Sequence, residues 1–562
     1  MTTNHYDAIV VGSGITGGWA AKELTEQGLK VLLLERGKNV EHRKGYKNEM
    51  KHPWELPFMG QGNKAYWDKH YAVQQHSGHL TEWNEDFWVD DLDHPYQSVQ
   101  SPAFRWLRGY QLGGKSLMWG RQSYRWSEAD FNANAQDGVG TDWPIRYGDL
   151  APWYDYVEEF VGISGAAEGL AQLPDGKFQP PMALNSVEQH IRATLQSKFK
   201  DRVLTVGRVA NLTQAKPEQG RGPCMNRAIC PRGCSFGAYF STQSSTLPAA
   251  VATGNLTLRT DSVVERVEYD QKTHRASGVH VIDRSTKEKH FFSAKVIFLC
   301  AGAFNSVGLM LRSKSAAFPN GIANSSGVLG KYIMDHATTL GVVSEIPGFE
   351  DSYYYGNRPT GVVIPRFVNL GEPQAYLRGF SYQGGAFRAG WSRGLREAGI
   401  GVKYKQQLQE AGPWKFVLTT FAECLPMAHN QITLDEQLKD IDGLPQLKID
   451  FRFSENEYKL LAAAKAEAAK MVEAAGGKVI FGRDQPNPGG SAIHEMGGAR
   501  MGKDPKTSVL NQYNQAHDVP NLFVTDGAAM ASSACQNPSL TYMALTARAA
   551  RKAAELVKSG AL

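Results

Sequence analysis

Three cysteines that lie close together in the sequence have the residue type and spacing to hold an inorganic group. Cys224, Cys230 and Cys234 form a C-x5-C-x3-C pattern within the Cys-rich loop 222–235. Three thiolates at this spacing can converge on one centre, and a proline directly after a cysteine, here Pro231, suits an iron–sulfur loop. Tetrahedral zinc requires a fourth ligand, and no other Cys or His lies nearby in the sequence.

This pattern leaves three interpretations. We favour a [3Fe–4S] cluster, which needs only three cysteines. A zinc or other metal site is the second interpretation, and a disulfide with one free thiol, or three inert thiols, is the third. The chain has only six cysteines in 562 residues, and the other three lie apart, so a disulfide-stabilised scaffold is excluded.

A glycine motif near the N-terminus has the spacing of a phosphate-binding turn. Gly12, Gly14 and Gly17 form the pattern G-x-G-x-x-G. In such a motif the first glycine permits a tight turn, the second lets the backbone approach a pyrophosphate, and the third lets a helix pack closely on a strand. The free N–H groups at the start of that helix would then face the phosphates.

The elements around these glycines fit a βαβ unit that binds a dinucleotide. Residues 7–11 and 30–35 are apolar and predict two strands, and residues 19–24 predict the helix between them. Glu35 ends the second strand, where its carboxylate can accept both hydroxyls of an adenosine ribose. The unit predicts dinucleotide binding without choosing between FAD and NAD. The alternative is a glycine-rich turn in an α/β domain that binds no nucleotide.

A second glycine block lies in residues 108–120. Gly113 and Gly114, followed by Ser116, permit close approach of the backbone to a flat ligand. By itself this block is more typical of an ordinary Gly-Gly turn. Residues 40–100 are rich in Trp, His, Gly and Tyr with weak periodicity, and we expect irregular structure over a cofactor or substrate site.

Periodicity places the other elements that must position these motifs. We expect a meander of strands at 256–258, 262–267 and 278–282, a buried strand that runs into a glycine turn at 295–303, and strand-like structure over 340–450. Helices are expected at 147–161, 455–475 and 542–557. The strand 522–525 ends on Asp526-Gly527, a pair that fits contacts to a flavin pyrophosphate and ribityl chain.

Composition excludes several classes of function. The net charge of +5 is small for this length, so charge does not indicate a nucleic-acid or membrane partner. No apolar run is long enough for a transmembrane segment. The N-terminus lacks the pattern of a signal peptide, and we therefore expect either a cytoplasmic enzyme or export to the periplasm together with a partner.

Together these blocks resemble the glucose–methanol–choline (GMC) family of flavin oxidoreductases. The resemblance extends from end to end, loosely in the middle, and is carried by the N-terminal glycines, the Gly113-Gly114 block, His494 with the glycines after it, and the segment from Thr525 to Pro538. It implies FAD and an α/β fold: a Rossmann-like FAD-binding domain interleaved with an α+β substrate domain built on an antiparallel sheet.

The resemblance also implies a domain assignment and further site residues. The FAD-binding domain would comprise 1–45, 205–310 and 490–562 with the block 108–120, and the substrate domain 46–204 and 311–489. Cofactor contacts are expected at Gly12, Gly14, Gly17, Glu35, Gly113, Gly114, Ser116, Val264, Asp526, Gly527 and Asn537. Some family members link FAD to a histidine in the Gly-Gly block, where this chain has Met118, so we expect non-covalent FAD.

The family's catalytic positions match His494 and Asn537. Oxidation of an alcohol removes a proton from oxygen and a hydride from carbon, and flavin accepts the hydride. A neutral imidazole can take the proton near neutral pH, while Asn537 can hydrogen-bond to the same oxygen. The alternatives are a core histidine bound to backbone carbonyls and an asparagine that only caps its loop.

The chain resembles bacterial enzymes that oxidise glucosides at C3 more than it resembles fungal oxidases. We therefore expect an FAD-dependent glucoside 3-dehydrogenase whose cluster passes electrons to a cytochrome c or quinone, with a small helper subunit. A GMC oxidase, or a dehydrogenase for another sugar, polyol or sugar acid, is the alternative within the family. A flavoprotein that only relays electrons is the alternative in another class.

Overall fold

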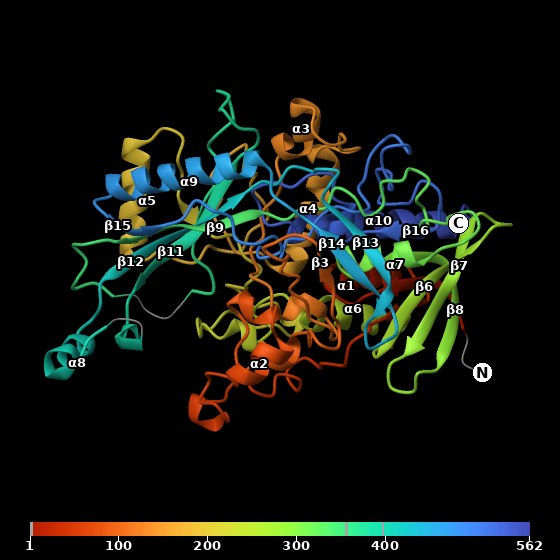
Figure 1. Cartoon of the computed structure of the whole chain (residues 1–562), viewed down its shortest axis with the longest axis horizontal. Coiled ribbons are helices and arrows are strands. Elements are labelled where there is room, and N and C mark those ends of the chain that lie inside the picture. Colours follow the sequence, from red (N-terminus) through yellow and green to blue (C-terminus); the bar gives the residue numbers. More distant parts are fainter. Residues whose placement is uncertain (1–3, 354–357, 396–397) are drawn as a thin grey trace.

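The computed structural model describes residues 4–353, 358–395 and 398–562, which are organised around two large sheets (Figure 1). A seven-stranded sheet lies at the end of the long axis that carries the C-terminus, and a six-stranded sheet lies at the opposite end. A three-stranded sheet flanks the first. The sequence prediction of a dinucleotide-binding α/β region joined to a region built on an antiparallel sheet is confirmed by this arrangement.

The first sheet has the strand order β5–β2–β1–β8–β7–β6, and β16 also pairs with β8. All pairings among β5, β2, β1, β8 and β16 are parallel, whereas β6, β7 and β8 form an antiparallel meander. Its strands are β1 (His5–Val11), β2 (Val31–Leu34), β5 (Leu256–Arg259), β6 (Ser262–Asp270), β7 (Arg275–Asp283), β8 (Lys289–Leu299) and β16 (Leu522–Val524).

Helices pack on the parallel part of this sheet because its strands are apolar on both faces. The helix that follows the glycine turn, α1, contacts α6 and the C-terminal helix α10, and α10 also contacts α4. The helices of this region are α1 (Ile15–Glu26), α3 (Glu128–Asp137), α4 (Tyr147–Val161), α6 (Thr246–Ala252), α7 (Ala303–Arg312) and α10 (Ser539–Lys558). The expected helices at 147–161 and 542–557 are therefore present.

The second sheet has the order β15–β9–β12–β11–β10–β4 and is antiparallel in every pairing. The helix α9 packs on it and contacts α5 (Figure 1). Its elements are β4 (Thr205–Val206), α5 (Ser186–Lys198), β9 (Ala337–Glu345), β10 (Val362–Ile364), β11 (Phe380–Arg388), β12 (Trp414–Ala422), α9 (Glu455–Ala474) and β15 (Lys478–Gly482). The helix expected at 455–475 is confirmed.

Two sequence predictions are wrong in detail. The strand at 256–258 does not belong to the meander, because β5 pairs in parallel with β2 and extends the nucleotide-binding sheet at its other edge. The region 340–450 is not only strand-like, since it also contains a short helix, α8 (Gly401–Gln409), which extends away from the body of the molecule (Figure 1). The sequence of α8 has no run of apolar residues that would have indicated a helix packed on the core.

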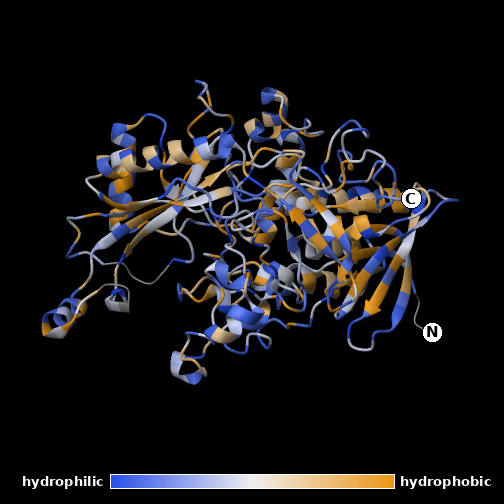
Figure 2. Cartoon of the chain, viewed as in Figure 1, coloured by the Kyte–Doolittle hydropathy of each residue, from blue (hydrophilic) through white to orange (hydrophobic). Residues whose placement is uncertain are grey.

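The third sheet lies beside the first and consists of β13 (Gln431–Lys439), β14 (Pro445–Asp450) and the short β3 (Gln97–Ser98). The segment between residues 40 and 100 is irregular, as expected, apart from α2 (Lys64–His70) and short 3₁₀ turns. Figure 2 shows that hydrophobic residues follow the strands of the first sheet. Among the described residues, no helix is both long and apolar enough to span a membrane.

Candidate active site

A cavity of about 700 Å³ lies where the parallel strands of the first sheet end. Its wall combines the glycine turn, the block 108–120, the strand end at 262–264 and the C-terminal segments around residues 491–495 and 526–542. Ligands of open α/β sheets bind at the carboxyl ends of the strands, so this is the expected position for a dinucleotide. The cavity is therefore lined by segments from the N-terminal, middle and C-terminal parts of the sequence.

The glycine turn has no room for side chains where it packs and open space where it faces the cavity. A Cβ atom on Gly17 would lie 1.8 Å from the carbonyl oxygen of Gly12, and Gly12 itself has a φ of +94°. A Cβ atom on Gly14 would meet nothing within 4 Å. The first turn of α1 has no side-chain cap, so its free N–H groups are available to phosphate oxygens.

Glu35 is buried at the end of β2, and backbone and hydroxyl donors hold its carboxylate. Ser13 donates from its N–H at 3.1 Å and from Oγ at 2.6 Å, and the N–H of Gly37 donates at 2.8 Å. Burial raises the pKa of Glu35, while these hydrogen bonds oppose the effect. Glu35 and Val264 both line the cavity.

The block 108–120 packs directly on the glycine turn. The N–H of Gly113 donates to Ser13 Oγ at 2.8 Å, and a Cβ atom on Gly114 would lie 3.4 Å from the Cα of Gly14. Ser116 Oγ donates to the carbonyl oxygen of Gly113 at 2.6 Å, which stabilises the turn. Met118 lines the same wall of the cavity.

Asp526 and Gly527 connect the end of β16 to the cavity. The Asp526 carboxylate accepts hydrogen bonds from the N–H of Gly302 at 2.9 Å and of Ala528 at 3.0 Å, and also from Ser306 Oγ. Burial raises the pKa of Asp526 to about 6 despite these donors. A Cβ atom on Gly527 would lie 2.2 Å from the carbonyl oxygen of Glu495, so this position has space only for glycine.

His494 and Asn537, which lie 43 residues apart in sequence, meet in the cavity wall. Asn537 Nδ2 lies 3.1 Å from His494 Nε2. Asn537 directly precedes Pro538 and α10. The first residues of this helix, Ser539 and Tyr542, line the cavity, so its positive dipole end faces the cavity. Burial, with the charges of His336 and Lys115, holds the pKa of His494 well below its usual range, so its imidazole is neutral at pH 7.

A buried carboxylate fixes the loop that carries His494. Asp335 accepts hydrogen bonds from the backbone N–H groups of Gly490 at 2.8 Å, Ala492 at 3.2 Å and His494 at 3.1 Å. Burial and the nearby Glu495 charge raise the pKa of Asp335 to about 7. Three donors from one loop to one carboxyl group hold the backbone of that loop in a single conformation.

The sequence analysis missed three polar side chains of this site. His336 Nδ1 lies 2.9 Å from His494 Nδ1, Gln383 Nε2 donates to Asn537 Oδ1 at 2.5 Å, and Lys115 forms an ion pair with Glu495 at 2.7 Å. His336 and Gln383 lie 158 and 154 residues from their partners. No local pattern could have indicated them, because only the pairing of the two domains brings them there.

The loop 222–235 holds its three cysteines as free, partly exposed thiols. Burial raises the pKa of Cys224, and the charges of Cys230 and Cys234 raise it further, so the three sulfurs lie within electrostatic reach of one another. Arg227 Nη2 lies 3.9 Å from Cys234 Sγ and pairs with Glu49 at 2.6 Å. The structure contains none of the disulfides that the third interpretation of this loop allowed.

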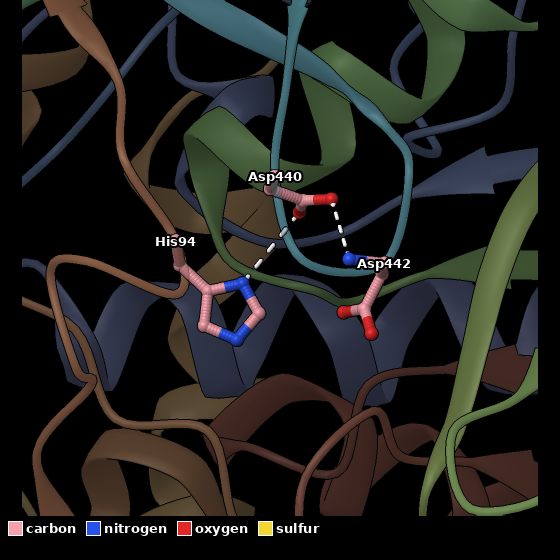
Figure 3. A group of neighbouring side chains, drawn as sticks. All are labelled: His94, Asp440 and Asp442. Atoms are coloured by element: carbon pink, nitrogen blue, oxygen red, sulfur yellow. Dashed lines mark hydrogen bonds and ion pairs between the residues drawn. The ribbon is translucent and has the colours of Figure 1, made fainter.

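A different set of metal-binding residue types lies beside Arg36, which lines the cavity. Among the residues that the structure describes, His94, Asp440 and Asp442 form one group whose ligand atoms all lie within 4.8 Å of one another (Figure 3). Arg36 lies 2.9 Å from Asp442 and 3.4 Å from Asp440, and Arg284 lies 3.6 Å from Asp442.

These arginines, with Lys287 at 3.8 Å from Asp442, supply three positive charges to two carboxylates. Burial opposes ionisation of Asp440, but its hydrogen bond with His94 and the charge of Arg36 lower its pKa to about 2. A divalent cation would add charge to a group that is already neutralised. The group is therefore an ion-pair network, which ties Arg36 to the loop between β13 and β14.

Comparisons with known proteins decide the family. Models of the GMC oxidoreductase family match residues 6–338 and 426–546. The chain belongs to the GMC oxidoreductase family. It is thus an enzyme, a flavin-dependent oxidoreductase, as the sequence motifs predicted.

Similar proteins extend over nearly the whole chain. A 2-methyl-1,2-propanediol dehydrogenase from Mycolicibacterium austroafricanum is 28% identical and aligns over 98% of this chain and 95% of its own length. The large subunit of a fructose dehydrogenase from Gluconobacter japonicus is 27% identical over 99% and 98%. The fold is similar to that of pyridoxine 4-oxidase from Mesorbium loti, with a TM-score of 0.61, 16% identity, and coverage of 97% and 98%.

Membership of the family implies FAD, and the cavity fits it. The glycine turn leaves open space at Gly14, and two helix N-termini face the cavity without side-chain caps. Two buried polar atoms of the cavity wall, Ser491 Oγ and Glu495 Oε1, have no hydrogen-bond partner among the described residues. Such atoms require a ligand or water, so the wall is built to meet a polar molecule.

Proposed function

We propose that this chain is an FAD-dependent dehydrogenase that oxidises a secondary hydroxyl of a sugar, at C3 of D-glucose or a D-glucoside, to the 3-keto sugar. Its electrons would leave through a [3Fe–4S] cluster to an external acceptor. The observation that carries the oxidation is the His494–Asn537 pair, a neutral base beside an amide donor in the wall of the cavity.

The two side chains divide the handling of the substrate oxygen. A hydroxyl bound between them would donate its proton to His494 Nε2 and accept a hydrogen bond from Asn537 Nδ2. Gln383 donates to Asn537 Oδ1 and so keeps the amide nitrogen on the side of His494. FAD, when bound, accepts the hydride from the substrate carbon.

The same cavity supports non-covalent binding of FAD. Met118 stands in the Gly-Gly block where some family members have the histidine that bonds to the cofactor, and a thioether cannot form that bond. Gly12 and Gly14 would receive the pyrophosphate, while Gly17 lets α1 pack closely behind them. Glu35 would receive the ribose, and Asp526 with Gly527 the pyrophosphate and ribityl chain. Gly114, Ser116 and Val264 line the cavity and would contact the remaining length of the cofactor, whereas Gly113 would act from behind the wall, where its N–H donates to Ser13.

The Cys-rich loop supports a multi-iron group better than a single zinc ion. Tetrahedral zinc needs a fourth ligand beside three cysteines, and among the described residues no complete group of metal-binding side chains forms at this loop. In a cluster each of Cys224, Cys230 and Cys234 would bind a different iron. Arg227 beside Cys234 offsets the negative charge that thiolates would bring.

The Cys-rich loop lies within electrostatic reach of Arg121, a residue of the cavity wall. Arg121 lines the cavity and lowers the pKa of Cys224 against the effect of burial. Its guanidinium lies 5.5 Å from the ring of Tyr239, a buried residue whose pKa is raised by burial and further by Cys230 and Cys234. Arg121 and Tyr239 thus connect the loop with the cavity wall, and a group held by the loop would exchange electrons with a flavin past these side chains.

The surface next to the loop supports docking of protein partners. Met50 and Trp54 are 67% and 69% exposed, and Met225 and Phe236 of the loop region are 57% and 42% exposed. Arg227 contacts both Met50 and the ring of Phe236, so these two exposed side chains share one patch with the loop. Apolar side chains exposed together mark interaction sites, here for the small helper subunit and a cytochrome c or quinone acceptor.

A second candidate function within the family is favoured by one relative. The similarity to a 2-methyl-1,2-propanediol dehydrogenase supports a non-sugar alcohol or polyol as substrate. An oxidase for another sugar, polyol or sugar acid, with oxygen as acceptor, would use the same His494–Asn537 pair. The candidates differ in substrate and acceptor, and not in the proton-transfer step.

The first test is flavin bleaching under anaerobic conditions. We expect methyl α-D-glucopyranoside or D-glucose to bleach the flavin absorbance, with NMR of the product showing a ketone at C3. In air, reduction of an artificial dye should be faster than release of hydrogen peroxide. Bleaching only by a diol or by D-fructose would establish the second candidate, and a rapid burst of peroxide would establish an oxidase.

The second test concerns the cysteines. We expect iron in aerobically purified protein and an EPR signal of an oxidised three-iron centre, both lost in Cys230→Ser. Transfer from substrate to dye should then slow more than flavin bleaching, because the electron exit is lost while the base remains. Cys424→Ser, a buried thiol far from the loop in sequence, should keep both the iron and the signal. Iron-free protein with full dye reduction would rule out the cluster.

A further inference from the structure

The hydrogen bonds beside the cavity continue past His494 into the interior. His494 Nδ1 lies 2.9 Å from Nδ1 of His336, whose other ring nitrogen, Nε2, lies 2.5 Å from the carbonyl oxygen of Ala534. On the cavity side, Asn537 Nδ2 lies 3.1 Å from His494 Nε2. The two imidazole rings are nearly perpendicular, with 79° between their planes.

The positions of the protons along this series of hydrogen bonds follow from its buried end, the carbonyl oxygen of Ala534. A carbonyl oxygen only accepts, so His336 Nε2 must carry a proton and donate it to Ala534. Burial lowers the pKa of His336 to about 4, so the ring is neutral near pH 7 and its Nδ1 carries a lone pair. The one proton between the two Nδ1 atoms therefore belongs to His494.

The hydrogen bond at the cavity side, between Asn537 and His494, agrees with a proton on His494 Nδ1. A neutral His494 with its proton on Nδ1 has a lone pair on Nε2, and Asn537 can donate to that lone pair. Gln383 donates to Asn537 Oδ1, which keeps the amide nitrogen turned toward His494. The opposite tautomer would set two lone pairs against each other between the histidines and two donors against each other at Asn537.

We infer that His336 is a positioning residue that fixes His494 in the Nδ1–H tautomer and thereby keeps the Nε2 lone pair available to the substrate hydroxyl. This inference rests on the proposed function, in which His494 takes the hydroxyl proton. His336 does not line the cavity, so it acts through His494 alone. The effect is a choice of tautomer and ring orientation.

A neutral imidazole in this place differs in effect from a carboxylate. A carboxylate that accepted from Nδ1 would stabilise the protonated imidazolium and raise the pKa of His494. The titratable groups that contact this loop include Lys115, which pairs with Glu495, and Asp335, which accepts from the N–H of His494, and Lys115 acts with burial to lower that pKa. His336 thus orients the ring without the addition of a negative charge, which leaves His494 unprotonated in mildly acidic solution.

A spectroscopic experiment tests the tautomer without a substrate. Long-range ¹H–¹⁵N correlation spectra of FAD-loaded protein labelled with ¹⁵N-histidine would distinguish protonated from unprotonated ring nitrogens, and His494→Ala would identify the signals. We expect a protonated Nδ1 and an unprotonated Nε2 in the native enzyme and in His336→Asn, whose amide oxygen can take the place of Nδ1. In His336→Leu we expect signals of both tautomers. A protonated Nε2 in the native enzyme would overturn the inference.

A double-mutant cycle tests whether His336 affects catalysis through His494. It uses the substrate that the flavin-bleaching experiment identifies. His336→Leu should lower kcat/KM roughly 10- to 100-fold, as loss of an orienting partner does elsewhere. The same change in the His494→Ala background should cause no further loss, whereas a merely structural role would lower both backgrounds equally. His336→Asn should retain activity within a few-fold of the native value.

The outcomes separate this inference from the function on which it rests. If His494→Ala keeps full activity, the proposed base is wrong. If His494→Ala is inactive while His336→Leu is as active as the native enzyme, only the role of His336 is wrong. If His336→Leu fails to fold, His336→Asn and the spectrum of the native enzyme still decide the tautomer.

Discussion

His494→Ala should lower kcat/KM for flavin reduction by about 100- to 10,000-fold, the usual contribution of a positioned general base. The native imidazole is neutral and unprotonated at Nε2, so it can accept the hydroxyl proton as the hydride leaves. Without it the proton must pass to water. The flavin spectrum of the variant should be unchanged, because the loop backbone remains bound to Asp335. Stopped-flow measurement of flavin bleaching gives the rate.

The pH dependence gives this prediction a second measurement. Burial and nearby charge hold the pKa of His494 below 6.5, so native activity should persist below that pH and fall only when the ring is protonated. His494→Ala should lose this acidic limb and become faster with rising pH, because hydroxide can then remove the proton. His517→Ala removes a histidine bound to Ser508 outside the cavity and should leave the rate unchanged. A His494→Ala rate within a few-fold of native would contradict the role.

The parts of the site that could be predicted from sequence are those that form locally. Gly12, Gly14 and Gly17 lie between a strand and a helix, so spacing alone indicates the turn. The strand β5 shows the limit, because its residues are equally suited to a meander and to a parallel edge beside β2. Its partner is chosen by the fold of the whole sheet.

The residues that orient the reacting pair could not be predicted. Asp335 and His336 precede β9 of the second sheet, and Gln383 belongs to β11, yet all three act on segments next to the C-terminal helix. Each contact depends on how the second sheet packs against the first. Residues at the start of β9 and within β11 of the second sheet thus hold the loop of His494 and the side chain of Asn537 at a cavity formed at the first sheet.

Gly17→Ala should give protein that lacks FAD and unfolds at lower urea concentration. The added Cβ would lie 1.8 Å from the Gly12 carbonyl oxygen, and because this neighbour is backbone, α1 must move away from β1. Overpacking of this kind costs about 1–3 kcal/mol or more of the free energy of unfolding. Gly148→Ala in the first turn of α4, where a Cβ meets nothing within 4 Å, should be neutral or slightly stabilising.

Gly14→Val, compared with Gly17→Ala, distinguishes an effect on helix packing from an effect on the approach of the cofactor. The two glycines lie three residues apart, and a Cβ atom meets backbone at Gly17 but nothing within 4 Å at Gly14. A side chain at Gly14 would extend into open space beside the cavity, and its φ of −64° suits any residue. We expect the apoprotein of this variant to unfold in urea as native apoprotein does, while fluorescence titration shows weakened FAD binding. Equal loss of stability in both variants would mean that the turn serves only to pack α1. Unchanged FAD affinity in Gly14→Val would mean that the pyrophosphate binds elsewhere in the cavity.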